Sequence, residues 1–257
     1  MIAVLSLSGG LDSTSLLLHL LLKKYKIYTV TYNYGQKHSI EIEYAKKNIE
    51  YLRSHGFKVE NRIVNISDCM ELLSSALTNK NIDIPLGHYE DMSMKETVVP
   101  NRNAIFASIL YGYALSISKR HNQRVDLSLG VHSGDHAIYP DCRPEFYNSI
   151  MKSFKLGNWD TENINIYLPY LNNSKSEIIK DAINSTNQLN LDFNLIFKNT
   201  ITTYFPNEDG LSDGKTGSDV ERILAFEELN LQDPAQYTDS WKNIVKNAKK
   251  YELKKTN

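Results

Sequence analysis

A run rich in glycine and hydroxyl groups near the N-terminus is the first part of the sequence that could do chemistry. It follows an apolar run at 2–7 and consists of Ser8, Gly9, Gly10, Leu11, Asp12, Ser13 and Thr14. Glycines allow a sharp turn that brings backbone N–H groups close to an anion. A helix that begins at Asp12 or Ser13 would direct its positive end to the same point. The run therefore predicts a cradle for phosphate or pyrophosphate.

Two common phosphate motifs do not describe this run. No Gly-Lys-Ser/Thr follows it, and the Gly-x-Gly-x-x-Gly spacing of dinucleotide folds is absent. The plain alternative is a glycine turn that caps a helix. That alternative explains an isolated Gly-Gly pair well, but seven such residues in this order, directly after a strand, favour anion binding.

Three further blocks combine polar, charged and aromatic residues. They cover residues 34–38 with Glu41, residues 99–106 (Val-Pro-Asn-Arg-Asn-Ala-Ile-Phe), and residues 130–146, which include Tyr-Pro-Asp-Cys-Arg-Pro-Glu-Phe. Each block lies at the expected carboxyl end of a strand or at the start of a helix. Because open parallel sheets bind ligands at that edge, we expect the three blocks to gather around the N-terminal loop.

Alternating strands and helices must position these blocks. Short apolar or β-branched runs predict strands at 2–7, 27–33, 58–66, 125–131 and 164–168. Helical spacing predicts helices at 16–22, 38–55, 103–117, 174–183, 218–229 and 239–253. We expect the 103–117 helix to be covered on both sides, and Ser218 or Asp219 to cap the next-to-last helix. The order predicts an α/β fold, a doubly wound parallel sheet with a small, mostly helical C-terminal extension; the expected domains are 1–200 and 201–257.

Composition excludes several classes of protein. The 257 residues include 29 Lys and Arg against 30 Asp and Glu, so no basic excess exists to hold a nucleic acid or an anionic membrane. The longest apolar run, 16–22, is too short to span a bilayer, and we expect no signal peptide. With only Cys69 and Cys142, a disulfide framework is excluded and a cytoplasmic location is expected.

The N-terminal run, Ser-Gly-Gly-x-Asp-Ser-Thr, resembles the pyrophosphate loop of the N-type ATP pyrophosphatases. These enzymes cleave ATP between the α and β phosphates and adenylate an oxygen of their substrate. With the later blocks, above all Tyr-Pro-Asp-Cys-Arg, the chain resembles the 7-cyano-7-deazaguanine synthase (QueC) family of queuosine biosynthesis from residue 1 to about residue 237. The resemblance implies an adenine-nucleotide α-hydrolase-like (HUP) sheet, ATP, Mg²⁺ and a homodimer.

The resemblance also implies a reaction. The carboxylate of 7-carboxy-7-deazaguanine is adenylated with release of pyrophosphate, ammonia converts it to an amide, and a second ATP-dependent step dehydrates the amide to the nitrile. For ATP binding it implies the seven loop residues and Tyr32. For catalysis we expect Asp12, Ser13, Arg102 and Lys175. For substrate binding we expect Gln36, Asn101, Arg102, Asp135, Tyr139, Asp141 and Arg143.

The residue types suit these roles. Asp135 and Asp141 can accept from a guanine-type N1–H and exocyclic amine, and Tyr139 can stack on the base. Arg143 can hold the substrate carboxylate, while Arg102 and Lys175 can neutralise the departing pyrophosphate.

Each assignment has a plainer alternative. Arg143 could pair with a neighbouring acid on the surface, Lys175 could be a solvated residue at a helix start, and Tyr139-Pro140 could be only a turn. Cys142 is favoured as a packed thiol over a nucleophile, because adenylate chemistry needs none. Metal binding by His132 and His136 is disfavoured, since no matched acidic or cysteine partners accompany them.

The chain departs from the family pattern at its C-terminal end. The resemblance implies four cysteines that hold a structural zinc, and the matching positions here are Phe205, Asp213, Thr216 and Asp219. Oxygen ligands of this kind are poor ligands for tetrahedral zinc, which prefers sulfur and imidazole. We therefore predict that this chain binds no zinc.

The missing zinc cysteines indicate a divergent member of the family, so the sequence does not decide which amine is joined to the activated carboxylate. Ammonia is one candidate. A protein amine is another, because QueC-like proteins occur in antiviral-defence operons, including the CBASS type, where the same activated carboxylate could be joined to a partner protein. A non-catalytic sensor of deazapurines or nucleotides is a further alternative. A tRNA-binding enzyme is disfavoured by the neutral charge.

Overall fold

The computed structural model describes residues 1–36, 40–73, 75, 97–134, 139–203, 207 and 210–253. Its centre is a five-stranded parallel sheet with the strand order β3-β2-β1-β4-β5. The strands are β1 (Ile2–Ser6), β2 (Lys26–Asn33), β3 (Val59–Asn65), β4 (Val125–Ser128) and β5 (Ile164–Ile166). The predicted doubly wound α/β sheet is confirmed, and each strand overlaps the range predicted for it.

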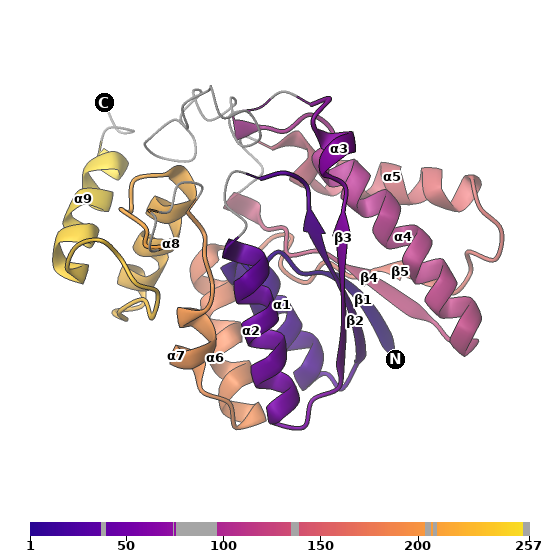
Figure 1. Ribbon diagram of the computed structural model, residues 1–257, viewed down its shortest axis with the longest axis horizontal. Helices are drawn as coiled ribbons and strands as arrows, with labels where there is room; N and C mark the ends of the chain where they lie inside the picture. The colour runs from indigo at the N-terminus through magenta and orange to yellow at the C-terminus, as the bar shows by residue number, and fades with distance from the viewer. Residues whose placement is uncertain are drawn as a thin grey trace.

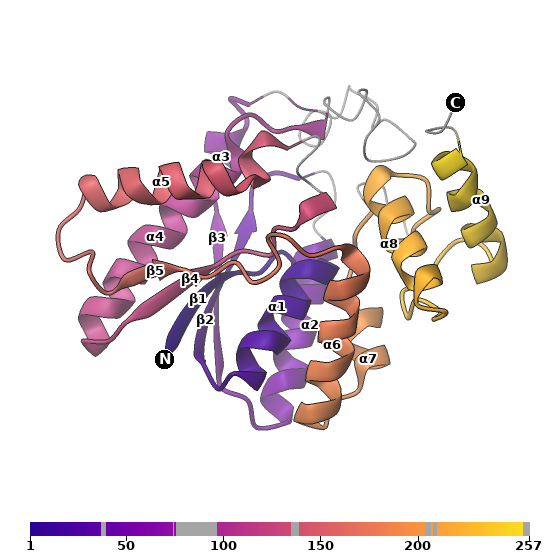
Figure 2. The ribbon, with the colours of Figure 1, turned by 180° about the vertical axis from the view of Figure 1, so that it is seen from behind.

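Helices cover both faces of the sheet, as Figures 1 and 2 show from opposite sides. On one face lie α1 (Leu11–Leu22), α2 (Ile40–Ser54), α6 (Lys175–Leu189) and α7 (Phe193–Lys198). On the other face lie α4 (Arg102–His121) and α5 (Pro144–Leu156). The short helices α3 (Ser67–Met70) and η3 (Pro140–Cys142) lie in connections.

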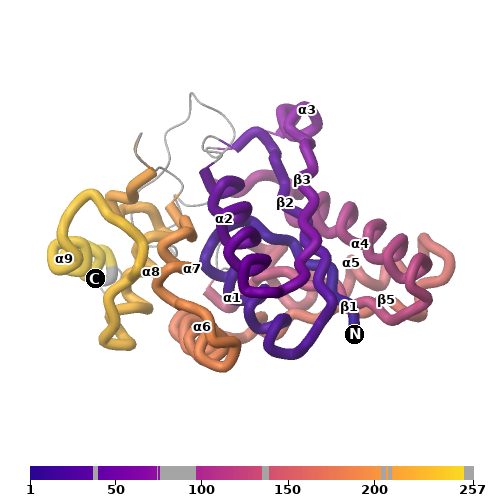
Figure 3. Tube along the Cα trace, turned by 60° about the horizontal axis from the view of Figure 1, so that its bottom comes forward, coloured from indigo at the N-terminus to yellow at the C-terminus, as the bar shows by residue number. Residues whose placement is uncertain are grey.

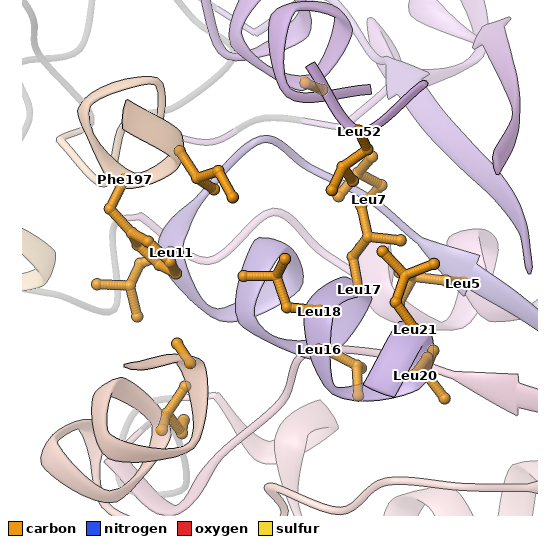
Figure 4. Packing of buried hydrophobic residues seen from close by; sticks show 14 of the residues in the cluster. Leu5, Leu7, Leu11, Leu16, Leu17, Leu18, Leu20, Leu21, Leu52 and Phe197 are labelled. Atoms are coloured by element: carbon orange, nitrogen blue, oxygen red, sulfur yellow. The ribbon is translucent and has the colours of Figure 1, made fainter. Parts of the chain in front are cut away.

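The core on the α1 face explains why this helix is so rigidly placed. Eight leucines of β1, the loop after it and α1 pack with Leu52 of α2 and Phe197 of α7, as Figure 4 shows. Leu16, Leu17 and Leu18 have no exposed surface, so α1 is buried nearly all round. Burying each such side chain contributes about 1.5–3 kcal/mol, and this packing fixes the N-terminus of α1 relative to the sheet.

Three details differ from the sequence predictions. No prediction covered α3, α5 or α7; α5 carries Tyr147, Met151 and Phe154 at helical spacing, whereas α3 and α7 are too short for a periodic signal. The α4 helix is not covered on both sides, because the small residues Ser108 and Gly112 face solvent. The N-cap of α8 is Thr216 rather than Ser218 or Asp219.

The C-terminal segment forms a small layer at one end of the molecule, beyond α6 and α7 (Figure 3). It contains α8 (Gly217–Glu228) and α9 (Trp241–Leu253), which share an apolar cluster of their own. The division of the chain at residue 200 stays a prediction. Within the described ranges, no helix has the length and apolar character needed to cross a membrane.

A buried ion pair holds α8 against the segment that follows it. Arg222 is 1% exposed and makes two bonds to the Asp233 carboxylate, from Nε at 2.6 Å and from Nη2 at 2.8 Å. Its remaining N–H groups donate to Thr202 Oγ1 and to the carbonyl oxygens of Phe197 and Thr200. The guanidinium thus links α8 to α7 and to residues 200–202, which follow α7.

We expect Asp233→Ala to lower the free energy of unfolding by about 3–5 kcal/mol, because it leaves the Arg222 charge buried without its counter-ion. Urea denaturation followed by circular dichroism measures the change. Glu227→Ala, also on α8, is the matched control: it removes an ion pair to Lys249 of α9 in which both side chains are at least 36% exposed. The control should lose less than about 1 kcal/mol, and equal losses in the two variants would contradict the prediction.

Candidate active site

The site lies where the sheet reverses its direction of winding, between the adjacent strands β1 and β4. The loop after β1 and the loop after β4 meet there at close range. A Cβ atom on Gly130 would lie 2.9 Å from the backbone nitrogen of Ser13. Only glycine allows this approach, so the sequence itself brings the loop after β4 onto the N-terminus of α1.

The N-terminal loop is shaped by its own hydroxyl groups. Ser13 Oγ accepts from the Ser8 N–H at 3.2 Å and lies 3.0 Å from Ser8 Oγ, which accepts from the Gly10 N–H at 3.2 Å. Gly9 has a φ of +88°, and a Cβ there would lie 2.1 Å from the carbonyl oxygen of Glu41. The loop is therefore pressed against the first turn of α2, and the positive end of α1 begins directly behind it.

Lys175 is the centre of the charged side of the site. Its Nζ lies 2.9 and 2.8 Å from the two carboxylate oxygens of Asp12, 3.2 Å from Glu221 Oε2 and 2.8 Å from His132 Nε2. The Lys175 side chain is 5% exposed, so the alternative of a solvated lysine is wrong. The ammonium joins α6, α1, α8 and the loop after β4 around one point.

Local sequence explains how Lys175 is aimed. It is the first residue of α6, and Ser174 before it forms a capping box with Glu177: Ser174 Oγ accepts from the Glu177 N–H, and the Glu177 carboxylate accepts from the Ser174 N–H. The start of the helix is thus fixed to one residue. The lysine side chain therefore extends from the first turn of α6 to Asp12.

Asp12 remains ionised in this setting. Burial alone would raise the pKa of its carboxyl, but the charges of Lys175 and His132, the hydrogen bond from Lys175 and the charge of Arg222 outweigh burial and lower the pKa below its ordinary value. An ionised Asp12 in turn favours the charged form of Lys175. The pair presents one cation beside the phosphate loop.

Sequence reasoning missed two members of this group. His132 is 1% exposed, and its Nδ1 accepts from the Gly134 N–H at 3.0 Å, which orients the ring toward Lys175. Glu221 comes from α8, in the segment expected to be a separate extension. His132 stood in a block already singled out, whereas nothing in the sequence links Glu221 to residues more than 40 positions away.

Aromatic side chains also line the site. Tyr32 stacks on Phe106 with ring centroids 4.2 Å apart and donates from its hydroxyl to the Phe106 carbonyl oxygen at 2.9 Å. Tyr139 is buried, and its hydroxyl lies 2.7 Å from Thr97 Oγ1. The Arg102 guanidinium lies 5.9 Å from the centroid of the Tyr34 ring.

One pocket brings most of the predicted site residues together. Those that line it are Ser8, Gly10, Leu11, Asp12, Ser13, Tyr32, Arg102, Tyr139 and Lys175. Glu41, Cys142, Thr202 and Glu221 also line it, so the C-terminal segment contributes to the same pocket. Cys142 is buried, with Asn103 Nδ2 3.4 Å from its Sγ, in agreement with a packed thiol that faces the pocket.

The other predicted residues lie behind or beside this lining. Gly9 packs on α2, Thr14 is buried in α1, and Gln36 contacts Glu41. Asn101 and Arg143 are exposed at the starts of α4 and α5. Asp135 and Phe205 lie outside the described residues.

Asp141 is half-buried, and its carboxylate has an unusual environment. It lies in η3 between two pocket-lining residues, Tyr139 and Cys142. Its Oδ1 atom is buried and has no hydrogen-bond partner within the part of the chain that the structure describes. A buried acceptor without a donor is costly, so this oxygen needs a donor that the described residues do not supply.

Known proteins resemble this chain over most of its length. The family model described as queuosine biosynthesis protein QueC matches residues 2–230. The chain belongs to the QueC family. A 7-cyano-7-deazaguanine synthase from Caldicellulosiruptor saccharolyticus is 40% identical over 235 residues, which cover 91% of this chain and 95% of that protein. Another, from Methanoregula boonei, is 41% identical over 235 residues, with 91% and 98% covered.

A solved structure offers much less. The NMN synthetase from Francisella tularensis gives a TM-score of 0.41 and 15% identity, with 98% of this chain and 84% of that chain covered. A likeness of this size bears on no functional statement. The homodimer, the lack of a nucleic-acid partner and the cytoplasmic location stay predictions.

The positions matched to the zinc cysteines of the QueC pattern have other partners in this chain. Asp213 is bonded to Lys215 at 2.9 Å. Thr216 Oγ1 donates to Asp219 Oδ2 at 2.5 Å and lies 3.2 Å from Ser218 Oγ. Burial raises the pKa of the Asp219 carboxyl, although the hydroxyl donors around it act in the opposite direction. These oxygen atoms form a hydrogen-bonded cluster and do not fit a tetrahedral zinc site.

We expect the purified protein to contain no stoichiometric zinc, because oxygen atoms already paired with each other replace the thiolates. Elemental analysis measures the metal. Incubation with a chelator should leave the melting temperature unchanged, and dialysis against zinc should not raise it. Tightly bound zinc in the segment 205–219 would show the prediction to be wrong.

Proposed function

We propose that this QueC-family chain adenylates the carboxylate of 7-carboxy-7-deazaguanine with ATP and joins it to ammonia, first giving the amide and then, with a second ATP, the nitrile 7-cyano-7-deazaguanine. Family membership makes it an ATP-dependent ligase of the 7-cyano-7-deazaguanine synthase kind. The observation that carries the proposal is one pocket that the phosphate loop, the Lys175–Asp12 pair and the aromatic side chains of Tyr32, Tyr34 and Phe106 all line.

Pyrophosphate release is the step for which the charged side of the pocket is built. In the proposed complex the β and γ phosphates lie at the N-terminus of α1, whose positive end attracts them. The N–H groups of Ser8 and Gly10 donate to the loop's own hydroxyls and so fix the shape of the loop. Lys175 and Arg102 supply cations from two sides of the pocket. Donors fixed before the reaction stabilise the negative charge that develops on the leaving pyrophosphate without reorganising.

The oxygen ligands at the site fit Mg²⁺. Asp12 and Glu221 are carboxylates beside the loop, and Mg²⁺ is bound by one or two carboxylates together with phosphate oxygens. These two side chains would hold it. The metal ion, when bound, neutralises charge on the phosphates. Lys175, whose ammonium contacts both carboxylates in this structure, would then donate to the phosphate oxygens instead.

The free edge of the pocket suits a guanine-like base. Asp141 is next in sequence to Cys142, which lines the pocket together with Tyr139. The Asp141 Oδ1 atom, which has no hydrogen-bond partner among the described residues, would accept from a ring N–H or an exocyclic amine. Asp135 and Arg143 keep the roles proposed for them from sequence. Arg143 is exposed, so it would have to hold the substrate carboxylate from the rim of the pocket.

Ammonia is the acceptor favoured by the relatives, whose name refers to a nitrile product and which align over nearly their whole length. Neither a contact among the described residues nor the name of a relative favours a protein amine or a non-catalytic sensor. A sensor would also have no need of the Lys175–Asp12 pair at the phosphate loop.

We expect Asp12→Ala and Ser13→Ala to reduce pyrophosphate release at least about a hundredfold, because each removes part of the preorganised phosphate site. Release from ATP and 7-carboxy-7-deazaguanine is measured with a coupled pyrophosphate assay. Asp12→Ala takes one of two carboxylate partners from the buried Lys175 ammonium and should lower the free energy of unfolding by about 3–5 kcal/mol. Ser13→Ala removes only hydrogen bonds within the loop and should lower it by about 1 kcal/mol. Asp192→Ala is the control: it removes the cap of α7 at a cost similar to that of Ser13→Ala and should leave release intact. A folded Asp12→Ala protein with full release would refute this placement of the phosphates.

We expect Asp141→Asn to weaken binding of 7-carboxy-7-deazaguanine by about 2–4 kcal/mol, since the amide presents a donor to a donor in a closed site. Isothermal titration calorimetry measures the affinity. Glu145→Gln, an exposed neighbour, should bind the substrate as the wild type does. If Asp141→Asn also binds normally, Asp135 is the residue that reads the base.

A further inference from the structure

Glu41 is a carboxylate in the pocket to which neither the sequence nor the relatives assign a role. It belongs to the first turn of α2, whose backbone presses on Gly9 of the phosphate loop. It lines the same pocket as Asp12 and Lys175. Unlike Asp12 and Glu221, it is bonded to a neutral amide, with Gln36 Nε2 2.8 Å from Glu41 Oε1.

The amide that holds Glu41 is itself fixed. Gln36 Oε1 accepts from the Tyr34 N–H at 2.9 Å, so its Nε2 must face the other way, toward Glu41 and the Tyr32 carbonyl oxygen at 3.4 Å. This determines which end of the amide meets the carboxylate. The Glu41 carboxylate is therefore held in one orientation by a hydrogen-bond donor that is itself fixed.

Two other polar groups act on the carboxylate. Arg102 from α4 attracts its negative charge, and Tyr34 lies close enough for their charges to interact. Both side chains line the pocket. Among the described residues, these are the charged or titratable groups that influence Glu41. When the phosphates of ATP bind Arg102, they neutralise most of the positive charge that Arg102 presents to Glu41.

We propose that Glu41 binds the ammonium ion and accepts its proton, so that NH₃ is delivered to the acyl adenylate inside the pocket. This inference rests on the proposed function and names the site of its second substrate. Ammonium, like the lysine side chain with its pKa of about 10.4, is protonated at neutral pH and cannot attack until it loses a proton.

The step balances without any further reactant. One proton passes from ammonium to the Glu41 carboxylate. The nitrogen lone pair of NH₃ attacks the acyl carbon, a C–N bond forms, and the bond from that carbon to the phosphate oxygen breaks. AMP leaves with the electron pair and takes a second proton from the nitrogen. The amide results, and Glu41 returns its proton to solvent.

The setting of Glu41 suits a base better than that of the other carboxylates. Burial raises its pKa to about 7, against the lowering effects of the Gln36 hydrogen bond and of Arg102. A base whose pKa lies near the working pH is both available and strong enough to take a proton. Asp12 and Glu221 instead contact the Lys175 ammonium and are the carboxylates proposed to hold Mg²⁺, so both have cationic partners other than ammonium.

The test separates adenylation from capture of ammonia. In Glu41→Gln, exchange of labelled pyrophosphate into ATP, which needs the carboxylate substrate but no ammonia, should stay within about threefold of wild type. Formation of amide from ammonium at pH 7 should fall about a hundredfold or more. Hydroxylamine is neutral at this pH, so hydroxamate formation should be retained. Glu43→Gln, an exposed neighbour on α2, is the matched control and should behave as wild type.

The pH profile gives a second readout. At fixed total ammonium, the Glu41→Gln rate should rise about tenfold per pH unit with free NH₃, whereas the wild-type rate should rise less steeply above pH 7. Equal loss of exchange and amide formation would overturn the proposal and assign Glu41 to ATP or base binding. Normal amide formation would also overturn it. Absence of exchange in the wild type would overturn the proposed function itself, and this inference with it.

Discussion

The position of the Lys175 ammonium is the constraint on which the rest of the site depends. A cation that is 5% exposed is stable only if opposite charges surround it, and here they come from α1 and α8, with an imidazole from the loop after β4. Asp12 and Lys175 are separated by 163 residues in the sequence. Folding the sheet correctly is what brings them together, so the charge pair forms only when the doubly wound topology is complete.

The C-terminal segment takes part in this arrangement through α8. Glu221 reaches Lys175 only if α8 is held at a fixed angle, and the neighbouring Arg222 supplies the hold by filling its donors with Asp233, Thr202 and backbone carbonyls. Where the resemblance implies zinc, this chain has a buried ion pair and a cluster of hydroxyl groups, which we expect to hold the segment in place of a metal. The catalytic pocket therefore requires a rigid segment at this place, and more than one chemistry can provide it.

Much of the fold was predictable, because strands such as 27–33 are β-branched and short while the helices between them are amphipathic or apolar. The phosphate loop was predictable for the same local reason, since its function resides in consecutive residues. Glu221 was not, because its role depends on where α8 lies rather than on its neighbours in sequence. The exposure of Arg143 and the stacking of Tyr32 on Phe106 likewise follow from tertiary packing alone.

The two sides of the pocket treat carboxylates in opposite ways. Asp12 lies against cations, which hold the pKa of its carboxyl below the ordinary value. Glu41 is hydrogen-bonded to a neutral amide, and burial outweighs the attraction of Arg102 and brings its pKa to about 7, where it can gain and lose a proton. Carboxylates whose pKa values are driven apart in one site commonly divide electrostatic and proton-transfer work between them. A reaction that must bind a polyanion and also deprotonate a cationic nucleophile needs both kinds of carboxylate, and α1 and α2, which both border the glycine loop, each supply one.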